Sequence, residues 1–128
     1  MNYIKYANKR WLMFQIEMEF VRGILFVRLE GVLSSRTSEE LRCALDRMIH
    51  DEGIRYFVIN LESLDYMDDV GLQSIMNHYF DIVLHDGKLV VCGSDDHVKI
   101  KANTKLIENF KMIESGQNEL EACRLIHI

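Results

Sequence analysis

The amino-acid sequence predicts a mixed α/β fold in which a sheet of four to five strands packs with about four helices. Residues 14–20 alternate between apolar and polar side chains, which is typical of a strand with one solvent-facing side. Residues 56–61 and 88–92 are nearly continuous apolar runs, as in strands that are buried on both faces. Apolar residues at helical spacing separate these runs. Strands joined through a helix usually run parallel whereas a hairpin is antiparallel, so the sheet is expected to be mixed.

A hairpin is predicted at the start of this sheet. The alternating strand is followed by Arg22 and Gly23, which suit a turn, and then by a second strand at Ile24–Leu29. Residues 31–35 are expected to form a loop.

The first helix follows this loop. Thr37 and Glu40 fit a capping box, in which the threonine hydroxyl and the glutamate carboxylate bind free amides at a helix start. Gly53 suits the end of the helix. The stripe that is predicted to face the core consists of Leu41, Ala44, Leu45, Met48 and Ile49.

A second helix is expected after the strand at 56–61 and a loop at 65–69. It begins near Val70 and ends at Gly87, which suits a left-handed cap. His78 and His85 fall outside the apolar stripe of this helix, so both are expected to be exposed. The stripe itself consists of Leu72, Ile75, Met76, Tyr79 and Val83.

The pattern weakens beyond the buried strand at 88–92. Residues 94–109 are polar with scattered apolar positions, which predicts one or two short helical turns. A short last strand is predicted at 110–113. A closing helix is predicted at 119–126, with Leu120, Cys123 and Leu125 facing inward.

Length and composition predict one domain. The chain has 128 residues, and it is divided here into an N-terminal extension at 1–13, expected to fray or pack on itself, and a domain at 14–128. The net charge of −5 argues against nucleic acid as a partner, because phosphate binding needs a concentrated basic surface. No apolar run has the length of a membrane span. The three cysteines are far apart, which predicts free thiols in or beside the core and a reducing, cytoplasmic location.

The candidate site is the strand-to-helix turn Asp68–Gly71, because ligands of open α/β sheets gather where strand ends meet helix starts. Asp68 or Asp69 is the expected cap of the helix. A divalent cation held by these two residues with Asp95 and Asp96 is an alternative that the sequence leaves open. The five histidines lack ligand spacing, and no Ser-His-Asp arrangement or Gly-rich phosphate loop is present. The sequence therefore predicts no metal, no cofactor and no enzyme activity.

Six segments of the sequence match the pattern of a known family in order along the chain. They are ILFVRLEGVL at 24–33, TSEEL at 37–41, YFVINL at 56–61, YMD at 66–68, GL at 71–72 and GKLVVC at 87–92. On these segments the sequence from Phe14 onward resembles STAS domains, the fold of bacterial anti-sigma factor antagonists. The resemblance spans nearly the whole domain, and it implies that the candidate turn is a surface for docking a protein.

The turn departs from the family's pattern. In members of the family this turn usually reads Asp-Ser-Ser-Gly or Asp-Ser-Thr-Gly, and a partner kinase phosphorylates one hydroxyl residue of that motif. Here Asp69 and Val70 occupy the two hydroxyl positions between Asp68 and Gly71, so the phosphoacceptor is lost. The aspartate that usually precedes the first helix is replaced by Ser34. Phosphate at a helix start adds about two negative charges, and this turn cannot switch in that way.

The leading hypothesis is a non-catalytic, cytoplasmic bacterial regulator of sigma factors and hence of transcription. It would bind an anti-sigma factor or a related serine protein kinase without being phosphorylated at the turn. A homodimer is left open. The alternatives are a structural STAS subunit of a larger signalling or lipid-transport assembly, and a sensor of a small ligand or cation. The residues expected to bind the partner are Asp68, Asp69, Val70, Gly71 and Leu72, with Ser34.

Overall fold

The structure is a computed structural model, and it describes residues 3–7, 14–94 and 98–127. Within these residues a seven-stranded sheet runs in the order β1-β2-β3-β4-β5-β7, and β6 pairs separately with β4. The pairs β1–β2 and β2–β3 are antiparallel, and every pair that involves β4 or β5 is parallel. The predicted mixed α/β fold is confirmed. The strands are β1 (Tyr3–Ala7), β2 (Phe14–Val21), β3 (Ile24–Leu33), β4 (Tyr56–Asp68), β5 (Lys88–Cys92), β6 (Lys99–Lys101) and β7 (Ser115–Gly116).

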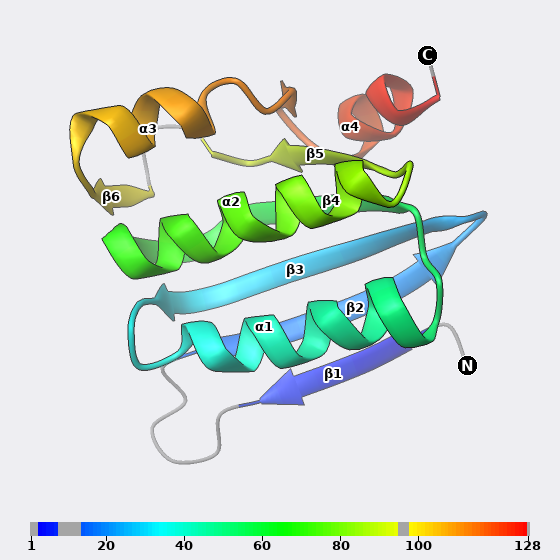
Figure 1. Cartoon of the computed structure of the whole chain (residues 1–128), viewed down its shortest axis with the longest axis horizontal. Helices are drawn as coiled ribbons and strands as arrows, with labels where there is room; N and C mark the ends of the chain where they lie inside the picture. Colours follow the sequence, from blue (N-terminus) through cyan, green and yellow to red (C-terminus); the bar gives the residue numbers. More distant parts are fainter. Residues whose placement is uncertain (1–2, 8–13, 95–97, 128) are drawn as a thin grey trace.

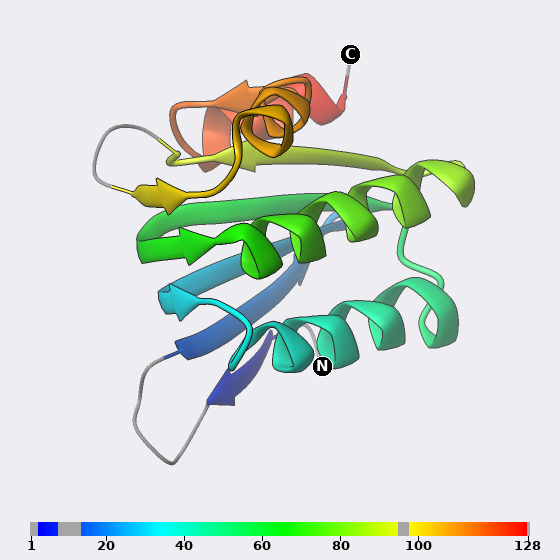
Figure 2. The same ribbon diagram turned by 60° about the vertical axis from the view of Figure 1, so that its left-hand side comes forward.

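The helices cover both faces of this sheet. Helices α1 and α2 lie side by side over one face (Figures 1 and 2), and α1 continues directly into a π-helical turn, η1. Helix α4 packs on the opposite face, against β3, β4 and β5. Helix α3 lies beside the start of α2 (Figure 1). The bounds are α1 (Ser38–Asp46), η1 (Arg47–Asp51), α2 (Asp69–Leu84), α3 (Thr104–Phe110) and α4 (Glu119–Ile126).

Alternation along the strands divides the core into two clusters. On β3, Leu25, Val27 and Leu29 belong to the large cluster that faces α1 and α2. Ile24 and Phe26 point the other way and belong to the small cluster under α4. Both faces of the central strands are therefore covered, as the continuous apolar runs predicted.

The two strands that lead to the candidate site are longer than predicted. β3 extends to Leu33 and β4 extends to Asp68, and the register pairs Leu33 with Met67. Strand pairing therefore continues into the segments 31–35 and 65–69, which were expected to be loops. Leu33 and Met67 are both fully buried there. This extension brings the short turn before α1 next to the first residues of α2.

The capping box predicted at Thr37 is wrong, although α1 does begin there. Thr37 makes no side-chain hydrogen bond to the helix start. Its hydroxyl instead donates to the carbonyl of Val32 at 2.7 Å and accepts from the N–H of Ser34 at 2.9 Å. The hydroxyl is buried beneath the turn, where unpaired backbone groups would be costly, so it serves the turn rather than the helix.

The inward face of α2 differs from the prediction near its C-terminal end. Val83 is 46% exposed, and Ile82 is buried in its place. His78 is also buried, contrary to the prediction, because α1 packs against this side of α2. Its Nδ1 lies 3.9 Å from Asp46 Oδ1, and burial lowers the pKa of the imidazole despite the neighbouring aspartates.

Gly87 does not adopt the predicted left-handed conformation. Asp86 does so, with φ of 61°, one residue earlier. A Cβ atom at Gly87 would lie 2.2 Å from the carbonyl oxygen of Arg55. Glycine is needed here because the backbone passes close to the segment that leads into β4.

The C-terminal part holds three further differences. Residues 110–113 are not a strand: Phe110 ends α3, and it is buried together with Ile113 at helical spacing. In α4, Leu120 is 63% exposed, contrary to the prediction, whereas Cys123 and Leu125 are half-buried against the core as predicted, and Ala122 and Ile126 are buried there as well. The short helical turns predicted within 94–109 include α3, but residues 99–101 in the same stretch form β6.

The predictions for the N-terminal extension and for the cysteines also need correction. Tyr3–Ala7 within the N-terminal extension forms β1 and pairs with β2, while residues 8–13 lie outside the described residues. Of the three cysteines Cys92 is buried and Cys123 is half-buried, but Cys43 is exposed on α1 and not in the core. No helix among the described residues is long and apolar enough to cross a membrane.

Candidate functional site

Asp68 joins the two turns that form the site. It is the N-cap of α2, and its Oδ1 accepts a hydrogen bond of 2.9 Å from the N–H of Gly71. Its Oδ2 accepts a longer bond of 3.4 Å from the N–H of Ser35, which lies in the turn between β3 and α1. The predicted cap is thus confirmed, and the same carboxylate also holds the neighbouring turn against the start of α2.

The side chain of Asp69, the first residue of α2, is held by a hydrogen bond. Its Oδ1 accepts a hydrogen bond of 2.8 Å from the backbone N–H of Asn103. Asn103 is the N-cap of α3, where its own Oδ1 accepts from the N–H of Leu106 at 2.9 Å. Asp69 therefore ties α2 to the segment that precedes α3.

Val70 and Gly71 differ completely in exposure. Val70 leaves 46% of its surface in solvent. Gly71 is buried, and a Cβ atom there would lie 2.2 Å from the carbonyl oxygen of Leu33. Leu72, which was expected to bind the partner, is instead fully buried in the core, so its side chain is not available for docking. The turn thus presents one apolar side chain to solvent from a backbone that is packed tightly against β3.

Ser34 lies in the adjacent turn and stabilises it. Its carbonyl accepts from the N–H groups of Thr37 and Ser38, and its Oγ accepts from the N–H of Arg36 at 3.3 Å. Ser34 therefore does not hydrogen-bond to Asp68 itself. The hydrogen bond to Asp68 comes from the backbone N–H of the next residue, Ser35.

An open groove of about 650 Å³ runs between α1 and α2 from this turn. Asp69 and Val70 line its beginning, and His78 and Asp81 line its other end. Its charged side chains are mostly acidic, although Arg42 pairs with Glu39 and, at 3.0 Å, with Asp46. The residues around it are Ser38, Glu39, Arg42, Asp46, Asp69, Val70, Gln73, Ser74, Asn77, His78, Asp81, Asn103 and Leu106.

The cation alternative rested on four aspartates. Asp95 and Asp96 lie outside the described residues. The other two, Asp68 and Asp69, direct carboxylate oxygens at backbone N–H groups of three different segments. Those contacts explain their position without a cation.

Sequence reasoning missed two residues of the site. Asn103 could have been found, because an asparagine ahead of the apolar pair Leu106 and Ile107 is a typical helix start. Ser35 contributes only its backbone N–H, so no side-chain pattern indicates it.

A separate ion-pair network lies on the other face of the sheet. Arg28 pairs with Glu119 at 2.7 Å, with Glu17 at 3.0 Å and with Glu19 at 2.9 Å. Asn60 also donates to Glu119, at 2.8 Å. The bond from Arg28, assisted by that from Asn60, lowers the pKa of Glu119 although burial opposes it. The network connects α4 to β2, β3 and β4, away from the candidate turn.

Comparison with known proteins gives a consistent result. The sequence profile of the STAS domain matches residues 15–119. The anti-sigma F factor antagonist of Paenibacillus polymyxa is 34% identical over 114 residues, which cover 89% of this chain and 96% of that protein.

Solved structures show the same fold. The anti-sigma factor antagonist SpoIIAA in its unphosphorylated form matches with a TM-score of 0.67 and 18% identity, over 88% of this chain and 97% of its own. An anti-sigma factor antagonist from Mycobacterium paratuberculosis matches with a TM-score of 0.71 and 17% identity, over 90% of this chain and 95% of its own. The profile match, the sequence relative and the shared topology agree, and the chain belongs to the STAS domain family.

Proposed function

We propose that this protein is a regulator of the anti-sigma factor antagonist type, which binds an anti-sigma factor or related serine kinase through the turn Asp68–Gly71. It acts by binding and not by catalysis, and binding does not depend on phosphorylation of the turn. The sequence relative from Paenibacillus polymyxa, named an anti-sigma F factor antagonist, supports this type of role. A partner of this type places the protein in the cytoplasm.

The observation that carries the proposal is that Asp69 and Val70, at the centre of the turn, have no hydroxyl group. The turn keeps its cap at Asp68 and its closely packed Gly71, yet the two residues between them have no hydroxyl. Asp69 already accepts from Asn103, and Val70 projects an apolar side chain into solvent. An apolar residue at the centre of a contact gains free energy when a partner removes it from water.

The groove next to Val70 suggests the charge of the partner. Among its lining residues Glu39, Asp46, Asp69 and Asp81 are acidic, against the single cation Arg42. A partner surface with basic side chains around an apolar centre would complement it, and such complementarity raises the rate of association.

The test uses the purified chain and anti-sigma factor kinases from the same genome. Calorimetry or size-exclusion chromatography should detect a complex with one of them. After incubation with ATP, mass spectrometry should find no phosphate on residues 68–71 of the wild type. The double variant Asp69→Ser with Val70→Ser restores both hydroxyls, and it is expected to accept phosphate there.

A matched control distinguishes a substitution in the turn from the same substitution at another exposed position of α2. Val83 is as exposed as Val70, at 46%, but lies near the other end of the helix. Val70→Asp should weaken the complex at least about tenfold, while Val83→Asp should leave it within about twofold, because only the former puts an uncompensated charge in the contact. Equal effects of both substitutions, or no complex with any such kinase, would contradict the proposal.

A further inference from the structure

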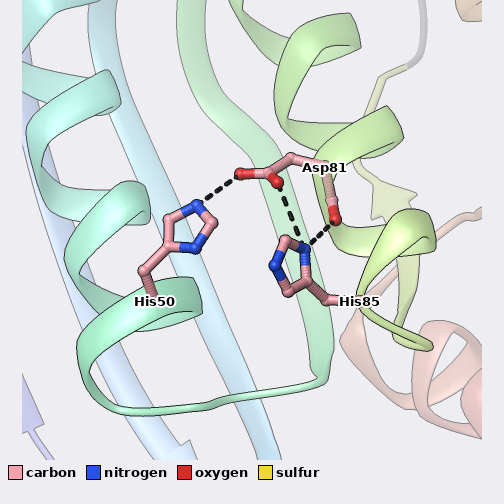
Figure 3. A group of neighbouring side chains, drawn as sticks. All are labelled: His50, Asp81 and His85. Carbon is pink, nitrogen blue, oxygen red and sulfur yellow. Dashed lines mark hydrogen bonds and ion pairs between the residues drawn. The ribbon is translucent and has the colours of Figure 1, made fainter.

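Three side chains of the kinds that bind transition metals converge at the far end of the α1–α2 pair. They are His50 on η1 and Asp81 and His85 at the end of α2 (Figure 3). Each offers one ligand atom, and these atoms lie within 4.8 Å of one another. His50 Nε2 is 2.9 Å from Asp81 Oδ2, and His85 Nδ1 is 3.2 Å from Asp81 Oδ1. We propose that this cluster binds a zinc ion.

The donor set suits that ion. Zinc binds imidazole nitrogen and carboxylate oxygen at roughly 2.0–2.2 Å, usually in a tetrahedron, which places neighbouring ligand atoms about 3.3 Å apart. The two histidine-to-aspartate separations, 2.9 and 3.2 Å, are close to this value, and all three ligand atoms lie within 4.8 Å of one another, so closing the site requires the two imidazoles to move closer together. Two imidazoles and one carboxylate do not suit magnesium or calcium, which prefer oxygen ligands alone.

The side chains are accessible enough for an ion to enter. The exposed fractions are 45% for His50, 27% for Asp81 and 41% for His85. Three protein ligands leave a fourth position for water or for a residue of a partner. His85 Nδ1 also lies 2.8 Å from the backbone carbonyl of Asp81, and zinc at this nitrogen would replace that hydrogen bond.

The local backbone supports the cluster. Asp81 and His85 are four residues apart, which places both on one side of α2. His50 belongs to a five-residue π-helical turn, and π-helical turns within helices are frequent at functional sites. No ligand spacing is visible along the sequence because His50 and Asp81 are 31 residues apart.

The cluster is separate from the proposed docking turn. Asp81 follows Asp69 by three turns of α2, a distance of roughly 18 Å at about 1.5 Å per residue. Zinc would join the C-terminal end of the first helical segment to that of α2, and a ligand that binds only the folded state raises its stability. The inference does not depend on the proposed function, and it can succeed or fail alone.

The experiment uses the full chain without a histidine tag, after treatment with a chelator. Calorimetry should show one zinc ion bound per chain, zinc should raise the midpoint of thermal unfolding, and magnesium should not. Cobalt should give the visible absorption of a four-coordinate site. His50→Gln and His85→Gln should each weaken zinc binding more than about 100-fold, since even outer-shell changes cost 10–100-fold.

Two control variants define the site. His127→Gln removes an exposed histidine beyond α4, and Cys43→Ser removes the exposed thiol, so both should keep the wild-type affinity. Circular dichroism checks that each variant is folded, and Asp81→Asn provides a third ligand change of nearly equal size. Absence of saturable zinc binding to the wild type would overturn the proposal. Binding that depends on Cys43 or His127 and survives loss of His50 would do the same.

Discussion

The carboxylate of Asp69 accepts a hydrogen bond of 2.8 Å from the backbone N–H of Asn103, so that the first residue of α2 anchors the residue that caps α3. β6 reinforces this arrangement, because it pairs with the last residues of β4 directly before α2. Asp69 thus has a structural role of its own within the turn. Substitution of Asp69 should therefore destabilise the start of α3 as well as the start of α2.

Asp69→Ala should loosen the start of α3. The Asn103 N–H loses its acceptor, and one hydrogen bond of this kind contributes about 1 kcal/mol. Hydrogen exchange measured by mass spectrometry should accelerate in peptides that cover residues 103–110. Asp69→Asn is the matched control, because its amide oxygen can still accept, and it should exchange like the wild type. Unchanged exchange in Asp69→Ala would show that this bond does not order α3.

Gly71→Ala should destabilise the whole fold. The added Cβ atom would lie 2.2 Å from the carbonyl oxygen of Leu33, so either α2 or the end of β3 must move. Overpacking of this kind costs about 1–3 kcal/mol or more. Urea unfolding measures the loss, with Ser74→Ala, on the same helix and in the groove, as a control expected within about 0.5 kcal/mol of the wild type. Wild-type stability of Gly71→Ala would refute the close packing.

Thr37→Val should reduce stability by about 2 kcal/mol although its shape is conserved. The buried hydroxyl donates to Val32 and accepts from Ser34, and valine leaves both backbone groups unpaired. Thr37→Ser keeps the hydroxyl and should lose only about 0.8 kcal/mol for the missing methyl group. Chemical unfolding of the two variants distinguishes hydrogen bonding from packing, and equal losses would argue against the role given to the hydroxyl.

Stability should decrease in acid partly through Glu119. Arg28 and Asn60 hold the pKa of this carboxyl below its ordinary value of 4.5 in the folded protein. A carboxyl whose pKa is lower when folded contributes stability above its unfolded pKa, and that contribution is lost as the pH falls from about 4.5 through the folded value. Glu119→Gln should therefore cost about 1–2 kcal/mol near neutral pH, and the difference from the wild type should shrink below about pH 4.5.

The control for this prediction is Glu108→Gln, a substitution of an exposed glutamate on α3. It should follow the wild-type curve of unfolding free energy against pH. A difference between Glu119→Gln and the wild type that stays constant from pH 7 to pH 3 would mean that ionisation of Glu119 is not the source.

The sequence predicted those features that depend on periodicity. Strong alternation located β2, continuous apolar runs located β4 and β5, and the stripe from Leu41 to Ile49 is buried throughout. The cap at Asp68 was also predictable, because a carboxylate before an apolar helix acts locally. Elements with such local causes could be read along the chain.

Features that depend on contacts between distant segments could not be predicted from the sequence. The ends of β3 and β4 extend because each finds the other as a partner, which no local pattern indicates. Thr37 looked like a helix cap, but its buried hydroxyl binds backbone groups of Val32 and Ser34 in the preceding turn instead. His78 is polar and falls outside the apolar stripe, yet the packing of α1 buries it. Each error arose where tertiary packing outweighed local preference.

The order of strands along the chain has a consequence for synthesis. β2 and β3 form a hairpin, whereas β4 must pair with β3, β5 and β6, and a helix separates each of these strands from β4 along the chain. A nascent chain can close the hairpin early, but the apolar faces of β3 stay uncovered until α1, α2 and β4 have left the ribosome. The unfinished hairpin is therefore the stage at which this protein most needs protection from aggregation, before its long-range parallel pairs can form.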